Sequence, residues 1–155
     1  MALVAACLIF AACTDDPPQQ SPSGDATPEQ PTEQEIDKMY ITINGNKLEV
    51  TLAKNSATAA LVEKLKQGDV TYVADDYGGF EKVGSLGFSL PTSNSQITTQ
   101  AGDVILYSGN QLVLFYGSNS WSYTKIGKIE GYSATELATL LAAGQGRVTV
   151  TLSLQ

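Results

Sequence analysis

Residues 40–52 have the sequence YITINGNKLEVTL, and this stretch carries the clearest structural signal in the chain. Apolar and polar side chains alternate on both sides of the pair Asn44-Gly45. Because Asn and Gly tolerate the positive φ angles of a type I′ turn, the pattern predicts a β-hairpin. The folded part of the chain therefore begins as antiparallel sheet.

Two short helices are predicted further along the chain. The first covers residues 57–67, because a capping residue, Asn55 or Ser56, precedes an apolar stripe at helical spacing and a glycine follows it. The second follows Ser133 and Glu136, which have the spacing of a capping box ahead of another apolar stripe that also ends at a glycine.

Short runs rich in β-branched and aromatic residues predict the remaining strands. They lie at residues 70–73, 86–90, 104–107, 111–116 and 147–154. The pair Gly109-Asn110 predicts a second hairpin turn. About eight strands with hairpin-length connections and no βαβ rhythm favour a mainly β fold. We expect a closed or nearly closed antiparallel eight-stranded barrel with two short helices, which leaves no exposed sheet edge.

The first residues of the chain have the pattern of a secretion signal. Residues 1–12 form an apolar run that is too short for a membrane span, which needs about twenty residues, but long enough for a signal peptide. The small residues before Cys13 resemble the lipobox at which bacterial lipoproteins are cleaved and acylated. Cys7 fits the same pattern but follows a shorter apolar run. We predict a signal peptide over residues 1–13 and a lipid anchor on Cys13; the alternative is an apolar element that packs on the domain.

Residues 14–38 hold five of the six prolines and no aromatic residue. Such a segment has too little to bury to offset the entropy of ordering, so it predicts a disordered acidic tether. Residues 39–155 then form one domain of ordinary size. Acids close behind Cys13 resemble the export signals of surface lipoproteins. The expected location is therefore the cell envelope, at the outer membrane or cell surface of a Gram-negative bacterium.

The placement of charge and of reactive side chains limits the function. Residues 1–38 hold seven of the sixteen acids against one lysine, a net charge of −6, so residues 39–155 carry only −1. A near-neutral domain lacks the basic excess that binds phosphates, which argues against a nucleic-acid partner. Both cysteines precede residue 14 and the chain has no histidine, so the domain lacks a thiol nucleophile and a zinc site. We expect no metal and no cofactor.

Three segments carry a family resemblance: YITINGNKLEVTLAKNSATAALVEKL, then DYGGFEKVGSLGFSLP, then AGDVILYSGNQLVLFYGSNSWSYTKIGKIEG. In this order they resemble the small bacterial cyclophilin-like domain family over most of residues 39–132. The resemblance implies an eight-stranded barrel with helices at its ends. It does not carry prolyl isomerisation with it, because catalytic cyclophilins use an arginine beside a phenylalanine-rich floor. This chain has no Phe-His-Arg segment, and its only arginine, Arg147, lies at the final strand.

The leading hypothesis is a lipid-anchored binding domain without catalysis, whose ligand is a peptide segment or a small molecule. The ligand would lie in a groove of the barrel. The rims of this groove are expected at the turn 77–79 and at residues 117–122, because binding side chains concentrate on loops of a rigid scaffold. Trp121 is placed in the second of these, a polar loop with no evident core for a large ring. The candidate ligand-binding residues are Tyr77, Phe80, Lys82, Tyr116 and Trp121.

Two alternatives remain. One is a prolyl isomerase with a non-standard site, in which backbone amides or Lys82 would stabilise the twisted imide. The other is a purely structural component of the envelope.

Overall fold

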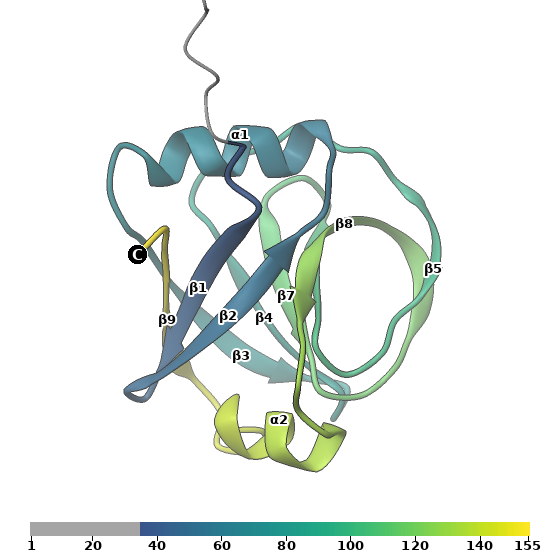
Figure 1. Ribbon diagram of the computed structural model, residues 1–155. Coiled ribbons are helices and arrows are strands. Elements are labelled where there is room, and N and C mark those ends of the chain that lie inside the picture. The colour runs from purple at the N-terminus through teal and green to yellow at the C-terminus, as the bar shows by residue number, and fades with distance from the viewer. Residues whose placement is uncertain (1–34) are drawn as a thin grey trace, which may run out of the picture. The chain divides into compact units, whose positions relative to one another are not determined.

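The computed structural model describes residues 35–155, which form a closed antiparallel barrel with a helix at each end (Figure 1). The strand order is β2-β1-β9-β3-β4-β7-β6-β8, and the barrel closes where β8 pairs with β2. This confirms the expected mainly β, eight-stranded architecture with two short helices. A further strand, β5, pairs with β8 outside the closed ring. The elements are β1 (Lys38–Ile43), β2 (Asn46–Leu52), α1 (Ser56–Leu65), β3 (Val70–Tyr77), β4 (Glu81–Ser85), β5 (Ser95–Thr98), β6 (Asp103–Tyr107), β7 (Gln111–Phe115), β8 (Ser120–Ile129), α2 (Ala134–Leu140) and β9 (Val148–Ser153).

The first two strands form the predicted hairpin. Ile43 pairs with Asn46 across a two-residue loop, in which Asn44 has φ 48° and Gly45 has φ 80°. These positive angles are those of the type I′ turn that the sequence predicts. β1 also pairs with β9 and β2 with β8, so the hairpin supplies the two strands at which the barrel closes.

The main hydrophobic core fills the inside of the barrel. Alternate residues of each strand point inward, as the fully buried Met39, Ile41 and Ile43 of β1 show. Removing such side chains from water is worth roughly 25 cal/mol per Å² of apolar surface, which makes this interior the main source of stability. Members of the core on other elements include Val50, Leu61, Ala74, Val104, Leu106, Leu112, Leu114, Ile126, Leu137, Val150 and Leu152.

The helices close opposite ends of the barrel (Figure 1). Asn55 caps α1, because its side chain accepts a hydrogen bond from the Thr58 amide at 3.0 Å. Its Nδ2 also donates to the Lys125 carbonyl at 2.6 Å, which ties the start of the helix to β8. α2 starts with the predicted capping box between Ser133 and Glu136. Both predicted helices are confirmed, with α1 starting at Ser56 rather than at residue 57.

The predicted strand at residues 86–90 is wrong. The strand in this region is β4, Glu81–Ser85, which lies between β3 and β7. Its sequence EKVGS holds one β-branched residue, so strand propensity does not reveal it. Leu86 and Leu90 are buried in a loop whose amides donate to the carbonyls of Asn110 and Gly109.

The second hairpin turn lies one residue earlier than predicted. Ser108 and Gly109 have the positive φ angles, 50° and 75°, and the Asn110 amide donates to the Tyr107 carbonyl at 3.3 Å. The loop thus combines a turn of type I′ geometry with one extra residue before β7.

Residues 35–37 precede β1 and already contact the barrel. Ile36 packs against the main core and the Asp37 carbonyl accepts a hydrogen bond from the Leu52 amide at 2.8 Å, both ahead of Met39. The expected signal peptide, the Cys13 anchor and most of the expected tether lie outside the described residues. Among residues 35–155, no helix has the length and apolar character that crossing a membrane requires.

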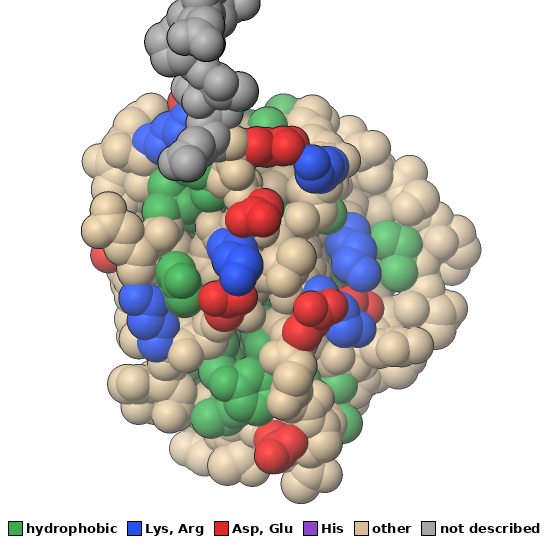
Figure 2. Space-filling view, viewed as in Figure 1, with side chains coloured by type: hydrophobic (Ala, Val, Ile, Leu, Met, Phe, Trp, Pro, Cys, Tyr) green, Lys and Arg blue, Asp and Glu red, His purple; other side chains and the backbone are tan. Residues whose placement is uncertain are grey.

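Charged side chains of both signs are interspersed over the face that carries β1 and β2 (Figure 2). Lys38 forms an ion pair with Glu49 at 2.8 Å, and Lys125 and Lys128 both lie near Asp103, at 3.2 and 3.6 Å. This face therefore presents no patch of a single charge.

Candidate functional site

The candidate site lies on the outer face of the barrel, where β4, β7, β6 and β8 are neighbours in the sheet. On β7, Leu112 and Leu114 belong to the main core, whereas Val113 and Phe115 belong to a second, smaller hydrophobic cluster. Successive side chains of a strand point to opposite faces, so this outer cluster lies outside the barrel. Apolar surface of this kind on a small domain needs a cover or a ligand.

One side of the outer cluster is covered by β5 and the first part of β8. Trp121 of β8 pairs with Ile97 of β5, whereas β8 pairs with β6 from Thr124 onward. β8 thus changes partner along its length, and Figure 1 shows β5 and the start of β8 curving out from the barrel wall. Ile97 packs against the outer cluster, so this strand pair forms one wall of the site.

Two buried aromatic rings, Phe115 and Tyr123, form the floor of the outer cluster, and the rings of Phe80 and Tyr107 pack against them. Phe80 stacks on Phe115 with 6.2 Å between the centroids and 8° between the planes. Tyr123 meets Phe115 edge to face at 5.9 Å and Tyr107 at 6.1 Å. Ring pairs of this kind contribute about 0.5–1.5 kcal/mol each beyond the area they bury. The rings therefore hold one another in place.

A pocket of about 380 Å³ opens between this floor and the wall. Exposed rings stand at its rim, because Tyr77, Tyr107 and Trp121 are 63%, 38% and 57% exposed. The volume falls near the lower end of the range for small-ligand pockets, roughly 300–1,000 Å³. The lining residues are Tyr77, Glu81, Val83, Tyr107, Gln111, Val113, Asn119, Trp121 and Tyr123.

Glu81 is the single charged residue among those that line the pocket. It is the first residue of β4 and pairs with Tyr77 on one side and Phe115 on the other. The residue is only 7% exposed and its Oε2 has no hydrogen-bond partner. Burial raises the pKa of the Glu81 carboxyl to about 7, because apolar surroundings disfavour the charged form. The pocket lining therefore includes a buried acceptor without a donor, in a carboxyl group that changes charge near neutral pH.

Asn119 fixes the phenol of Tyr123 at the edge of the pocket. Its Nδ2 donates to the Tyr123 hydroxyl at 2.9 Å. The backbone of Asn119 is held in turn by Thr99, which donates to its carbonyl from both the amide and Oγ1. Burial, followed by the negative charge of Glu81, raises the pKa of Tyr123, which keeps the phenol protonated.

Lys82 lies in a different environment from Glu81, because the two are successive residues of a strand and point to opposite faces. Its side chain is fully buried, and Nζ forms an ion pair with Asp76 at 2.9 Å and donates to the Gly146 carbonyl at 2.6 Å. The Tyr116 hydroxyl donates to the same carboxylate at 3.1 Å. Burial acts to raise the pKa of Asp76, but hydrogen bonds from Lys82 and Gly146 outweigh it, so the pKa lies below its usual range. These groups join β3, β4 and the residue after β7 to the loop before β9.

The structure brings together only part of the predicted site. Tyr77 and Trp121 line the pocket, and Phe80 lies beside it in ring contact with Tyr77 and with the floor. Lys82 and Tyr116 belong to the inward network and are not among the lining residues.

Trp121 lies on a strand and not in the polar loop that the sequence predicts. It is the second residue of β8, where pairing with β5 overrides a sequence rich in Ser and Gly.

The prediction missed several of the lining residues, among them Glu81, Val83, Tyr107 and Tyr123, whereas Asn119 lies within the rim predicted at residues 117–122. A signal for two of them was present, because Glu81 and Val83 share one face of a strand, opposite to Lys82. That signal can be used only if β4 is recognised as a strand, and strand propensity does not reveal it.

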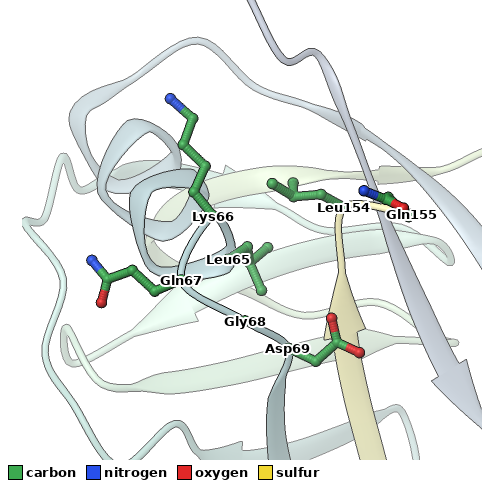
Figure 3. A pocket seen from close by; sticks show the side chains of 7 residues that line it. All are labelled: Leu65, Lys66, Gln67, Gly68, Asp69, Leu154 and Gln155. Atoms are coloured by element: carbon green, nitrogen blue, oxygen red, sulfur yellow. The ribbon is translucent and has the colours of Figure 1, made fainter.

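A larger hollow of about 630 Å³ lies between the end of α1 and the end of β9 (Figure 3). Figure 3 shows the side chains of Lys66 and Gln67 extending in different directions. Ligand pockets have polar groups that converge on one point, so the aromatic pocket is the better candidate. The residues around this hollow are Leu65, Lys66, Gln67, Gly68, Asp69, Leu154 and Gln155.

The chemistry available in the aromatic pocket is ring contact, hydrogen bonding and the exchange of one proton. In the part of the chain that the structure describes, His, Cys, Asp and Glu side chains form no group of three suited to a metal ion. Arg147 forms an ion pair with Asp75 at 3.3 Å and does not line the pocket. Glu81 thus has no basic partner there.

Comparison with known proteins supports the fold. The chain is similar to the solution structure of a hypothetical protein from Archaeoglobus fulgidus, with a TM-score of 0.60 and 15% sequence identity over 80% of this chain and 99% of the other. At this identity the likeness shows the fold alone. No curated protein matches the chain. A model of the cyclophilin-like family matches residues 41–153, from β1 to the end of β9. This match spans the whole barrel, and the chain therefore belongs to the cyclophilin-like family.

Proposed function

We propose that this protein is a lipid-anchored, extracytoplasmic binding domain that holds a peptide segment or a small molecule in the aromatic pocket without catalysis. The observation that carries the proposal is the lining of the pocket, where four aromatic side chains, those of Tyr77, Tyr107, Trp121 and Tyr123, are joined by Glu81, whose buried Oε2 has no partner. Rigid rings supply contact area at low cost in conformational entropy. A single carboxyl with no nucleophile or base beside it is suited to recognition rather than to bond cleavage.

The lipobox at Cys13 and the acidic, Pro-rich segment after it support the anchored location. The proposed site of action is the outer membrane or the cell surface of a Gram-negative bacterium.

Trp121 provides the test of binding, because it is the only tryptophan and lines the pocket. The full chain carrying Cys13→Ala, which prevents acylation, is screened against a collection of fragments and tetrapeptides by ¹⁵N NMR. We expect compounds that shift the Trp121 indole resonance together with the Tyr123 amide. Trp121→Ala should weaken the binding of these compounds by about 1–3 kcal/mol. It should cost little stability, because a half-exposed ring contributes little to the free energy of folding.

Val73→Ala is the matched control, since Val73 is 46% exposed on β3 and does not line the pocket. It should bind the same compounds as the wild type. If Trp121→Ala binds normally but unfolds several degrees early, Trp121 is a structural residue and the proposed pocket is wrong.

Prolyl isomerisation remains the second candidate, favoured by the apolar floor of the pocket in a barrel of the cyclophilin-like family. The residue that could have assisted it, Lys82, is fully buried and paired with Asp76. Isomerisation of an X-Pro tetrapeptide is therefore expected to proceed at the uncatalysed rate in the presence of the full chain. A faster rate that Trp121→Ala abolishes would replace the binding proposal with the enzymatic one.

A further inference from the structure

We infer that the ligand of the aromatic pocket presents a protonated amine, whose N–H donates to Glu81 and whose alkyl carbons contact the surrounding rings. The inference rests on the proposed binding function and names the chemical class that the pocket selects. It starts from three properties of the site: the unpartnered carboxylate oxygen, the exposed rings and the sign of the local charge.

The first property is the unpartnered Oε2 of Glu81. Glu81 is more than nine-tenths buried, lines the pocket, and has an Oε2 to which no group of the described chain donates. A buried polar atom in this state costs free energy, about 1–3 kcal/mol and more if it is charged. A ligand that brings an N–H donor removes this cost, and one that also brings a positive charge stabilises the ionised carboxylate.

The rings favour the same kind of ligand. Tyr77, Tyr107 and Trp121 are exposed at the rim, and they come from β3, β6 and β8. The faces of aromatic rings carry partial negative charge, and they attract cations within about 6 Å of the ring centroid. An ammonium group beside Glu81 would place its alkyl substituents against these faces.

Cations are not excluded by any positive charge in the lining. The lining holds one carboxyl and no lysine or arginine. Lys82, next to Glu81 in sequence, is directed to Asp76 at 2.9 Å on the inner side of the sheet. The field inside the pocket is thus negative or neutral according to the state of a single group.

The size and chemistry of the pocket further restrict the class of amine that it can bind. A volume of about 380 Å³ fits one head group or side chain rather than an extended segment. A quaternary ammonium ion satisfies the rings but has no N–H, so it leaves Oε2 of Glu81 without a donor. We therefore expect amines that retain at least one N–H to bind more tightly than their fully methylated analogues.

The experiment compares three small probes that share a butyl chain: n-butylamine, 1-butanol and butyltrimethylammonium. Each is titrated at pH 8 into the ¹⁵N-labelled full chain carrying Cys13→Ala, and the Trp121 indole and Tyr123 amide resonances report occupancy. We expect n-butylamine to bind about tenfold more tightly than 1-butanol, since Coulomb attraction in a partly buried site adds to ring contact. Butyltrimethylammonium should bind more weakly than n-butylamine.

Glu81→Gln tests the role of the carboxylate, because Gln keeps the shape of the side chain and removes its charge. This variant should bind n-butylamine no more tightly than 1-butanol, so the preference for the amine is lost. Glu130→Gln is the matched control, since Glu130 is exposed and outside the pocket. It should keep the wild-type preference.

The pH dependence gives a second readout. The other ionisable side chains that line the pocket with Glu81 are the phenols of Tyr77, Tyr107 and Tyr123, and the Tyr116 hydroxyl donates to Asp76 on the other side of the sheet. Phenols ordinarily titrate only at about pH 10. Glu81 alone therefore changes charge between pH 6 and 8. Affinity for n-butylamine should rise over this interval in the wild type and stay constant in Glu81→Gln, with a proton released on binding that calorimetry in two buffers detects.

The possible failures are distinguishable. Equal binding of n-butylamine and 1-butanol to the wild type, or a preference for the amine that survives Glu81→Gln, overturns the amine inference and leaves the pocket as a binding site. Tighter binding of butyltrimethylammonium than of n-butylamine overturns the role of the N–H donor. If neither these probes nor the fragments and peptides shift the Trp121 and Tyr123 resonances, the proposed binding function fails as well.

Discussion

Glu81 and Lys82 are adjacent, yet the fold uses them in opposite ways. Lys82 points into the barrel, where Asp76 and the Gly146 carbonyl compensate its charge. Glu81 points outward into an apolar surface where nothing compensates it. A buried ion pair with further hydrogen bonds is costly to break because it leaves a lone charge behind, which makes Lys82 a structural residue. A carboxyl that lacks such a partner and faces a pocket is a candidate for function.

Replacing Glu81 with Gln should stabilise the protein at pH 8 and not at pH 4. The pKa of about 7 in the folded state exceeds the ordinary value of 4.5, so the folded state holds this proton more tightly than the unfolded state. The resulting stability is complete below pH 4.5 and is lost as the pH rises through 7. The uncharged Gln escapes that loss, which a shift of this size makes about 3 kcal/mol.

Urea unfolding of wild type and variant between pH 4 and pH 8 measures this difference. Other titrating groups are common to both proteins and cancel in the comparison. A difference in unfolding free energy that stays constant with pH would show that Glu81 is not desolvated as described.

Single residues of the site could be predicted only where they are large and conspicuous. Trp121 and Tyr77 were found because a ring in a polar or Gly-rich context is unusual. Glu81 could not be found, because an acid followed by a lysine normally indicates solvated surface. Its role depends on the position of β4 between β3 and β7, and that pairing is a property of the whole barrel.

Among the elements, β8 does most to shape the site. Its first part pairs with β5 and forms the wall of the pocket, and its last part closes the barrel against β2. An irregularity in the β6–β8 register, between Val104 and Ile105, lies between these two parts. Such irregularities bend a strand and increase its twist. The bend lets one strand serve both the closed barrel and the outer wall.

Gly127→Ala should destabilise the barrel at its closure. Gly127 pairs with Leu52 of β2, and an added Cβ would lie 2.4 Å from the Thr51 carbonyl oxygen and 2.7 Å from Val50 Cγ1. Backbone cannot move aside as a flexible side chain can, so we expect a loss of about 2–4 kcal/mol. Thermal and urea unfolding provide the measurement.

Ser122→Ala on the same strand is the control, since Ser122 is exposed on the part of β8 that pairs with β5. It should change stability by less than about 0.5 kcal/mol. If Gly127→Ala is equally neutral, the β2–β8 closure tolerates separation and contributes little to the fold.

Elements could be predicted where local chemistry decides them. The Asn44-Gly45 hairpin and the capping box at Ser133 are confirmed because each depends on residues within a few positions of one another. β4, β5 and the start of β8 were not predicted, because Ser- and Gly-rich segments become strands only through partners distant in sequence.

At the scale of the whole molecule, the barrel interior is not available for ligands. Large aliphatic side chains fill it and α1 and α2 cover its ends, while Lys82 and Asp76 occupy the inner side of β4 and β3. Any recognition by residues 35–155 must therefore use the outer surface, where the aromatic pocket lies. The uneven charge of the sequence agrees with a division of roles, since residues 39–155 carry −1 and the segment before them −6.

The lipid anchor on Cys13 is the prediction that concerns the chain as a whole. Cys13 follows an apolar run of about twelve residues that ends in two alanines, whereas Cys7 follows only six residues, too few for the apolar region of a signal peptide. When the full chain is expressed in a Gram-negative host fed with radiolabelled palmitate, the wild type and Cys7→Ala should both incorporate the label and fractionate with membranes. Cys13→Ala should incorporate none, because the acylated sulfur is gone. Label that persists in Cys13→Ala but disappears in Cys7→Ala would move the anchor to Cys7, and label in none of the three proteins would leave the domain without the membrane attachment that its proposed function includes.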